Sequence, residues 1–331
     1  MFTITKARRR EGAKSSEQRR HDLSAVARSA KAEGAKASQP RRHDDTMTRR
    51  LILVGCVISW LAGALVAAQA PPSRIISLVP AATEMLFAIG AGPRVVAVSS
   101  YDHEPPDVER LPRVGALLDP DLERILGLRP DLVVVYGTQH DLQQQLTRAA
   151  IPVFGYKHGG LAHGGLAEVT STIRALGERT ATAARANDVA AAIERDLSDI
   201  RARVAGRPRP RTLLVFGREP GTLRNLYASG GVGFLHDMLE VAGAVNVFAA
   251  EKRESVQASS ETLLAAAPEV IIELHYATSA VDLNAWQALP ALPAVRTNRL
   301  IVLTGTDLVT AGPRVAAATR RLAKALHPEA F

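Results

Sequence analysis

Cysteine is almost missing from this chain, which has one such residue among 331. That residue, Cys56, lies inside an apolar run from Leu51 to Ala68. If the chain is cut behind this run, the product has no thiol, and disulfides, cysteine metal sites and cysteine nucleophiles are all excluded. No later apolar run is long enough to span a membrane.

A basic globular surface is missing too, although the formal net charge is +8. Residues 1–50 hold 14 Lys and Arg against 6 Asp and Glu, whereas residues 51–331 hold 27 of each kind. The positive charge therefore belongs to the head of the chain. The neutral remainder lacks the electrostatic footprint of a nucleic-acid-binding protein, so we predict no nucleic-acid partner.

The first 68 residues are typical of an export signal preceded by an extension. Residues 1–46 are basic, poor in apolar residues and without periodicity, and we interpret them as a disordered or mis-annotated extension. Residues 47–68 contain a short basic stretch, an apolar core and small final residues, which predicts a signal peptide cut after Ala68. The alternatives are a retained anchor helix and a lipoprotein box that ends at Cys56.

Short apolar strands alternate with helical patterns on both sides of one long segment. The strands are continuously apolar, which favours parallel sheets covered on both faces. Residues 166–205 are rich in Ala and Arg, contain no proline and have helical spacing, so we predict one long helix that Gly177 could interrupt. The fold class is α/β, with lobes at 74–165 and 210–328.

The sequence contains an internal repeat with an offset of 138 residues. Residues 122–132 match residues 260–270: a Glu opens a short helix, a Pro follows seven residues later, and an acid then precedes a buried strand. The two acids at the helix starts are Glu123 and Glu261. Two lobes that each carry an acid at the same place form a quasi-symmetric object, suited to docking on a symmetric partner.

Several motifs together resemble one known family. They are the segments Arg74 to Glu84, Ser99 to Asp102, Pro105-Pro106, Leu122 to Ile125 and Arg129 to Leu132. Through them, residues 74–327 resemble the periplasmic binding proteins of ABC importers for cobalamin and ferric siderophores. The resemblance implies two Rossmann-like lobes joined by one long rigid helix, with a ligand cleft between them.

The same resemblance implies a function. A periplasmic, monomeric, non-enzymatic protein without a cofactor would capture a cobalamin-type corrinoid and deliver it to the transmembrane permease of an ABC importer. A ferric siderophore or haem is the alternative ligand. The resemblance also implies that Glu123 and Glu261 pair with arginines of the permease. The alternative is that each acid only stabilises the first turn of its helix through the helix dipole.

The resemblance further implies ligand contacts in the cleft, where aromatic side chains hold a flat ring. Tyr101, Phe216 and Tyr227 match such aromatics. Leu117 and Ser255 stand where tryptophans are expected.

Polar groups near the end of the family pattern are only partly retained. Asp307 matches an expected acid, but Thr310 replaces its arginine partner. Arg218 and Arg224 could supply positive charge to a carboxylate-bearing ligand. The alternative is that both are solvated loop residues.

Other chemistry finds little support in the sequence. The histidines at 103, 140, 158 and 163 form no H-E-x-x-H motif and no helical i, i+4 pair, so we predict no metal site. His103 or Tyr101 at the cleft mouth could still act as an axial ligand to a bound haem or corrinoid. The Gly-rich segment 229–233 lacks the lysine and spacing of a nucleotide loop. An exported metal-dependent enzyme is the alternative from another class.

Overall fold

A computed structural model describes residues 70–157, 165–276 and 281–331, all within one compact unit, Gln69–Phe331. The extension, the expected signal peptide and Cys56 lie outside the described residues. Within the described part, no helix combines the length and the apolar character that crossing a bilayer requires.

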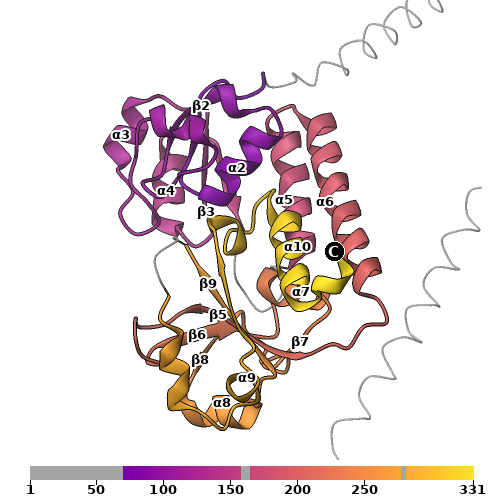
Figure 1. The fold of residues 1–331 in the computed structure, drawn as a ribbon. Helices are drawn as coiled ribbons and strands as arrows, with labels where there is room; N and C mark the ends of the chain where they lie inside the picture. The colour runs from indigo at the N-terminus through magenta and orange to yellow at the C-terminus, as the bar shows by residue number, and fades with distance from the viewer. Residues whose placement is uncertain (1–69, 158–164, 277–280) are drawn as a thin grey trace, which may run out of the picture. The chain divides into compact units, whose positions relative to one another are not determined.

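The first lobe is a four-stranded parallel sheet in the order β2-β1-β3-β4 (Figure 1). Strands β1, β2 and β3 are almost wholly buried, as their continuous apolar runs predict, whereas the edge strand β4 is only partly buried. The elements are β1 (Ile75–Ser77), α2 (Pro80–Ala88), β2 (Val95–Val98), α3 (Leu122–Gly127), β3 (Leu132–Tyr136), α4 (His140–Arg148) and β4 (Val153–Tyr156).

The second lobe has a mixed sheet in the order β10-β9-β5-β6-β8, with the short β7 beside β5. Its elements are β5 (Arg211–Gly217), β6 (Leu226–Ser229), α7 (Phe234–Val241), β7 (Val245–Asn246), β8 (Ser255–Ala258), α8 (Ser260–Ala266), β9 (Val270–His275), α9 (Pro293–Arg296), β10 (Leu300–Thr304) and α10 (Val315–Leu326). Strands β10, β9 and β5 are parallel, whereas β6 and β8 are antiparallel. The prediction of parallel sheets is confirmed for β10, β9 and β5 but does not hold at this antiparallel edge. There the strands are short and alternate between buried and exposed residues, which the continuous-run criterion does not detect.

The single helix predicted over residues 166–205 is also wrong, because the segment forms two helices, α5 (Leu166–Arg179) and α6 (Ala183–Val204). Ala181 takes the left-handed conformation, with φ 54°, and turns the chain between them. The helices run side by side (Figure 1), so close that a Cβ on Gly177 would lie 2.2 Å from the Cβ of Ala186. The same apolar period continues through both helices, so periodicity alone did not reveal the turn.

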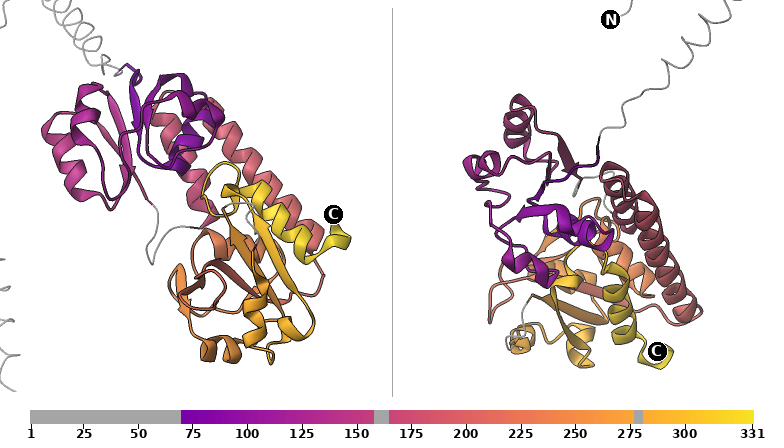
Figure 2. Two further views of the ribbon diagram at one scale, coloured as in Figure 1. Left: turned by 60° about the vertical axis from the view of Figure 1, so that its left-hand side comes forward. Right: turned by 90° about the horizontal axis from the view of Figure 1, so that it is seen from above.

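One apolar core runs through both lobes and the two linking helices. It contains residues of β1 and α2 from the first lobe, of α5 and α6, and of β9, α7 and α10 from the second. The C-terminal helix α10 packs along α6, as the yellow and pink helices of Figure 2 show. Because interiors are close-packed, a core shared in this way favours one fixed arrangement of the two lobes.

An ion pair joins the lobes directly at the edge of this core. The guanidinium of Arg314, just before α10, donates two hydrogen bonds of 2.8 Å to the carboxylate of Glu84 in α2. Glu84 is 7% exposed and Arg314 34%. The hydrogen bonds to Glu84 raise the pKa of Arg314 above its usual value. Close by, the Tyr156 hydroxyl donates to the carbonyl of Ala311 at 3.2 Å.

We expect Arg314→Met to lower the free energy of unfolding, because it leaves the buried Glu84 carboxylate without its partner. Loss of one member of a fully buried pair costs about 3–5 kcal/mol; for the part-exposed Arg314 we expect about 2–3 kcal/mol. Urea unfolding measures the change. Arg320→Met in α10, which removes the exposed partner of Asp199, is the matched control and should lose much less. Equal losses would contradict the interlobe role.

Candidate functional site

A cleft of about 980 Å³ lies where parallel strands of both lobes end. Its walls include Tyr136 and Tyr156, the last residues of β3 and β4, and Ser99, which follows β2. The second lobe contributes Tyr276 directly after β9 and Thr306 shortly after β10. In open α/β sheets, ligands bind beyond the carboxyl ends of the strands, because side chains from several strands meet at that edge. The cleft therefore occupies the place that this topology provides for a ligand.

Four tyrosines line the described walls of the cleft. Tyr101 from the first lobe is 71% exposed and Tyr276 from the second is 66% exposed. Deeper in the cleft, the rings of Tyr136 and Tyr156 meet edge to face, with centroids 6.1 Å apart. Exposed rings offer large, amphipathic contact surfaces at a small cost in conformational entropy. This arrangement suits a bulky ligand that has both apolar and polar surface.

The charged groups of the cleft are acidic. Glu104 and Asp119 line it, together with Glu84, whose carboxylate Arg314 already neutralises. Among the described lining residues there is no Lys and no Arg. Binding of an anionic group would leave its charge without a partner here, and an unpaired charge taken out of water is costly.

A buried carboxylate supports the loop that carries Tyr101. One oxygen of Asp102 accepts hydrogen bonds from the backbone N–H of Ser99, at 2.9 Å, and from the Ser99 hydroxyl. Its other oxygen has no partner among the described residues. Arg113 donates to the carbonyls of Ser99, at 3.1 Å, and of Asp102. Burial raises the pKa of Asp102 above its ordinary value, although the hydrogen bonds from Ser99 oppose the rise.

The structure places the sequence-predicted ligand residues in different surroundings. Tyr101 and Leu117 line the cleft, and so does Thr310. Phe216 and Tyr227 are not among the lining residues; their rings pack on each other with centroids 6.5 Å apart. The carboxylate of Asp307 is held by Arg321 on α10 at 2.9 Å.

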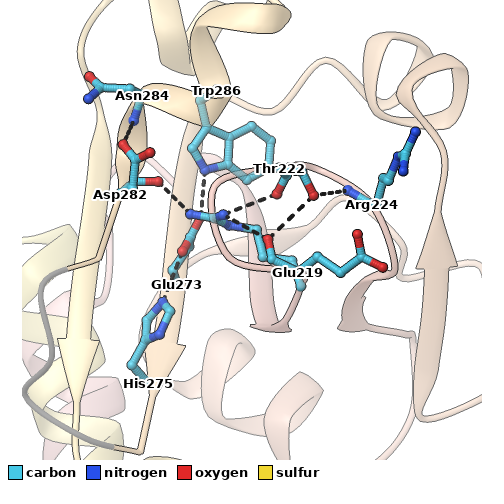
Figure 3. Close-up of polar contacts among 9 residues, drawn as sticks. Glu219, Thr222, Arg224, Glu273, His275, Asp282, Asn284 and Trp286 are labelled. Atoms are coloured by element: carbon cyan, nitrogen blue, oxygen red, sulfur yellow. Dashed lines mark hydrogen bonds and ion pairs between the residues drawn. The ribbon is translucent and has the colours of Figure 1, made fainter.

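Arg218 forms the centre of a buried network in the second lobe. Its Nε donates to Glu273 at 2.9 Å, and its terminal nitrogens donate to the carbonyls of Thr222 at 3.1 Å and Asp282 at 2.7 Å. The indole N–H of Trp286 and the ring of His275 also contact Glu273 (Figure 3). The Arg218 side chain is 4% exposed, so its charge is already neutralised inside the lobe. Arg224 stays exposed.

Sequence reasoning missed Tyr136, Tyr156 and Tyr276 as cleft residues. Each ends or directly follows a strand of the parallel part of its sheet, so its position at the carboxyl end of that strand was the available signal. Of the histidines, His103 lines the cleft and lies 3.3 Å from Glu109, while His140 begins α4. His158 and His163 fall outside the described residues. In the described ranges, no group of three or more metal-ligating side chains is placed to hold an ion.

The two acids of the internal repeat occupy equivalent helices. Glu123 lies in the first turn of α3 and Glu261 in that of α8, and both are exposed. Ile125 of α3 packs on the face of the first sheet opposite the linking helices, and Leu263 of α8 does the same in the second lobe. No hydrogen bond or ion pair within the described residues involves either acidic carboxylate.

The same set of hydrogen bonds, here called the clamp, occurs in both lobes and is made by one arginine that holds the end of α3 or α8. The Arg74 side chain donates to the carbonyl of Leu128 at the end of α3, and Arg211 donates to that of Ala266 at the end of α8. In each lobe the backbone N–H of that arginine also bonds to the acid before the next strand, Asp131 or Glu269. The repeat extends to the left-handed residues 129 and 267, with φ 48° and 44°.

We expect the stability of the protein to depend on pH through Asp102. Its raised pKa means that the folded state binds the proton more tightly than the unfolded chain does. The resulting stabilisation is complete below the unfolded pKa and is lost as pH rises through the folded pKa. We would measure the free energy of unfolding in urea at pH values from about 4 to about 7. Over this range it should fall more for the wild type than for Asp102→Asn. Asp188→Asn, at an exposed site of α6, should follow the wild type. Parallel curves for Asp102→Asn and the wild type would contradict the assignment.

Comparisons with known proteins agree with this geometry. A family model described as periplasmic binding protein matches residues 75–306. The vitamin B12-binding protein of Salmonella typhimurium is 31% identical over 256 residues, which cover 76% of this chain and 90% of that protein.

Two solved structures are similar in fold and in sequence. The vitamin B12-binding protein BtuF of Vibrio cholerae has a TM-score of 0.65 at 26% identity, covering 78% of this chain and 98% of that one. The apo heme-binding protein RhuT of Roseiflexus sp. RS-1 has the same TM-score and identity, covering 78% and 99%. With two lobes around a cleft, a matching family model and these relatives, the chain belongs to the periplasmic binding protein family.

Proposed function

We propose that this protein is the exported solute-binding protein of an ABC importer, which captures a cobalamin-type corrinoid in the interlobe cleft and delivers it to the permease. The observation that carries the proposal is a cleft of about 980 Å³ with exposed tyrosines from both lobes and neither lysine nor arginine among its described lining residues. The vitamin B12-binding relatives support the same ligand class.

The charge of the cleft separates the ligand classes. The periphery of a corrinoid carries mainly neutral amides, which tyrosine hydroxyls and backbone groups can bind without a cation. A haem carries two propionates, and many ferric siderophores are anionic, so both favour arginine or lysine in the site. Of the two cations predicted for such a ligand, Arg218 is neutralised by Glu273 and Arg224 is not among the lining residues. These features favour a corrinoid over haem or an anionic siderophore.

Tyr136 and Tyr156, the two less exposed tyrosines of the cleft, also favour a corrinoid. Burial raises the pKa of Tyr136 and of Tyr156, so both hydroxyls stay protonated near neutral pH. A protonated phenol donates a hydrogen bond, whereas a tyrosine that ligates iron does so as the phenolate. The Tyr156 hydroxyl already donates to the carbonyl of Ala311, so toward a ligand it accepts from an N–H, whereas the Tyr136 hydroxyl can donate. Both roles suit an amide-bearing ligand better than a ferric centre.

The remaining parts of the proposal concern the whole chain. We place the protein in the periplasm, exported through a signal peptide at 47–68 that follows an extension at 1–46. It acts as a monomer without a catalytic activity. The lobes at 74–165 and 210–328 and the linking segment at 166–205 form the working unit, and the exposed acids Glu123 and Glu261 dock on basic residues of the permease.

Equilibrium dialysis of the chain from Gln69 onward against cyanocobalamin, haem and a ferric hydroxamate siderophore tests the ligand. We expect stoichiometric binding of cyanocobalamin, weakened about tenfold by Tyr101→Ala or Tyr276→Ala because each removes one exposed ring. Tyr101→Phe and Tyr276→Phe keep the ring and serve as controls. Preferential binding of haem or of the siderophore would show that the corrinoid assignment is wrong.

If Glu123 and Glu261 dock on the permease, their removal should affect uptake of the ligand but not its binding. The double variant Glu123→Ala and Glu261→Ala should retain the affinity for cyanocobalamin, because both acids lie outside the cleft lining. Uptake of labelled cyanocobalamin by cells that depend on this protein should fall to background, since the charge pairs with the permease are lost. Loss of affinity together with uptake would contradict the docking assignment.

A further inference from the structure

Two exposed leucines repeat with the same offset as the two docking acids. Leu126 in α3 is 38% exposed and Leu264 in α8 is 44% exposed, and their positions differ by 138 residues. Each leucine follows its acid by three residues. Positions three apart in a helix are neighbours on its surface, so Leu126 lies next to Glu123 and Leu264 next to Glu261.

Single exposed leucines are common and need no explanation, but this pair has few counterparts. Of the seven large apolar side chains exposed in the described residues, four line the cleft: Tyr101, Leu117, Leu118 and Tyr276. Outside the cleft only Leu126, Leu264 and Tyr227 remain. Two of these three therefore occupy equivalent positions of the internal repeat.

The scaffold beneath the pair is duplicated as well. Ile125 and Leu263 bury the opposite side of each short helix, and the Arg74 and Arg211 side chains hold the carbonyl groups at the helix ends. Both helices are thus fixed to their lobes by contacts of the same kind. An exposed leucine and an unpaired acid are presented by two rigid and equivalent supports.

We propose that Leu126 and Leu264 are the apolar half of a duplicated docking surface, in which each leucine enters an apolar depression of the permease beside the basic group that binds its acid. The proposal rests on the importer function above. Protein interfaces commonly have an apolar core surrounded by a polar rim. A partner with twofold-related subunits offers two equivalent sites, as the 138-residue repeat requires.

The negative charge beside each leucine favours the permease, rather than the lipid bilayer, as the binding partner. Each leucine has an acid beside it that has no partner within the described part of the chain. The surface of an anionic bilayer repels carboxylates and attracts lysine or arginine. An acid beside an apolar side chain therefore fits a basic protein site with an apolar pocket.

Photocrosslinking in cells of the source organism tests the surface directly. The full chain carries p-benzoylphenylalanine at position 126, at position 264 or, as a control, in place of the exposed Arg195 of α6. We expect positions 126 and 264 to give adducts that mass spectrometry assigns to the integral membrane subunit of one ABC importer, and position 195 to give none. Adducts with phospholipid alone, with that subunit from only one of the two positions, or with no partner would overturn the proposal.

A pair of double variants provides the functional readout. Leu126→Ser with Leu264→Ser should lower cyanocobalamin uptake at limiting ligand about tenfold, with unchanged affinity in dialysis. Gly127→Ser with Ala265→Ser is the matched control, because both residues are exposed neighbours in the same helices and also repeat at 138. Equal uptake by the two double variants would refute the leucine role.

The two readouts also separate this proposal from the proposed ligand. If cyanocobalamin is not the ligand, the wild type shows neither binding in dialysis nor uptake, whereas the crosslinks from 126 and 264 to the importer subunit still form. If the ligand is right and the leucine surface is wrong, binding, uptake and their dependence on Glu123 and Glu261 persist without those crosslinks.

Discussion

The apolar core shared by the two lobes and the linking helices is the constraint on which the rest of the structure depends. Because α5, α6 and α10 pack into one cluster with both sheets, the cleft has walls of fixed separation. The ion pair between Arg314 and Glu84 closes this core at its edge and neutralises the most buried acid of the cleft wall. A ligand therefore meets a largely preformed site, which reduces the ordering cost of binding.

The cleft and the proposed docking surface use different parts of the same repeated lobe. The carboxyl ends of the parallel strands supply the cleft residues, whereas α3 and α8 lie on the outer sheet faces, away from the linking helices. Changes in one surface therefore need not disturb the other. Arg218 illustrates the division: its charge serves the interior of the second lobe, where it compensates Glu273, and the cleft retains its acidic character.

Much of this was predictable because it depends on local signals. Continuous apolar strands indicated the parallel sheets, and the repeated Glu, Pro and acid of residues 122–132 and 260–270 indicated two equivalent helix–strand units. The clamp geometry confirms this equivalence down to the left-handed residues Arg129 and Ala267. Glu123 and Glu261 are exposed, as the predicted docking on a partner requires. Their role at a permease is still a prediction.

The sequence by itself determined the α/β class, the two lobes and the neutral globular part, because strand periodicity, repetition and charge are properties of composition and order. Only the tertiary structure decided that residues 166–205 form two packed helices, since the turn at Ala181 leaves the apolar period intact. It also decided which side chains face the cleft. Tyr276 lines it while Phe216 and Arg218 do not, because contacts between residues far apart in sequence determine whether a side chain at a strand end is free or already bound.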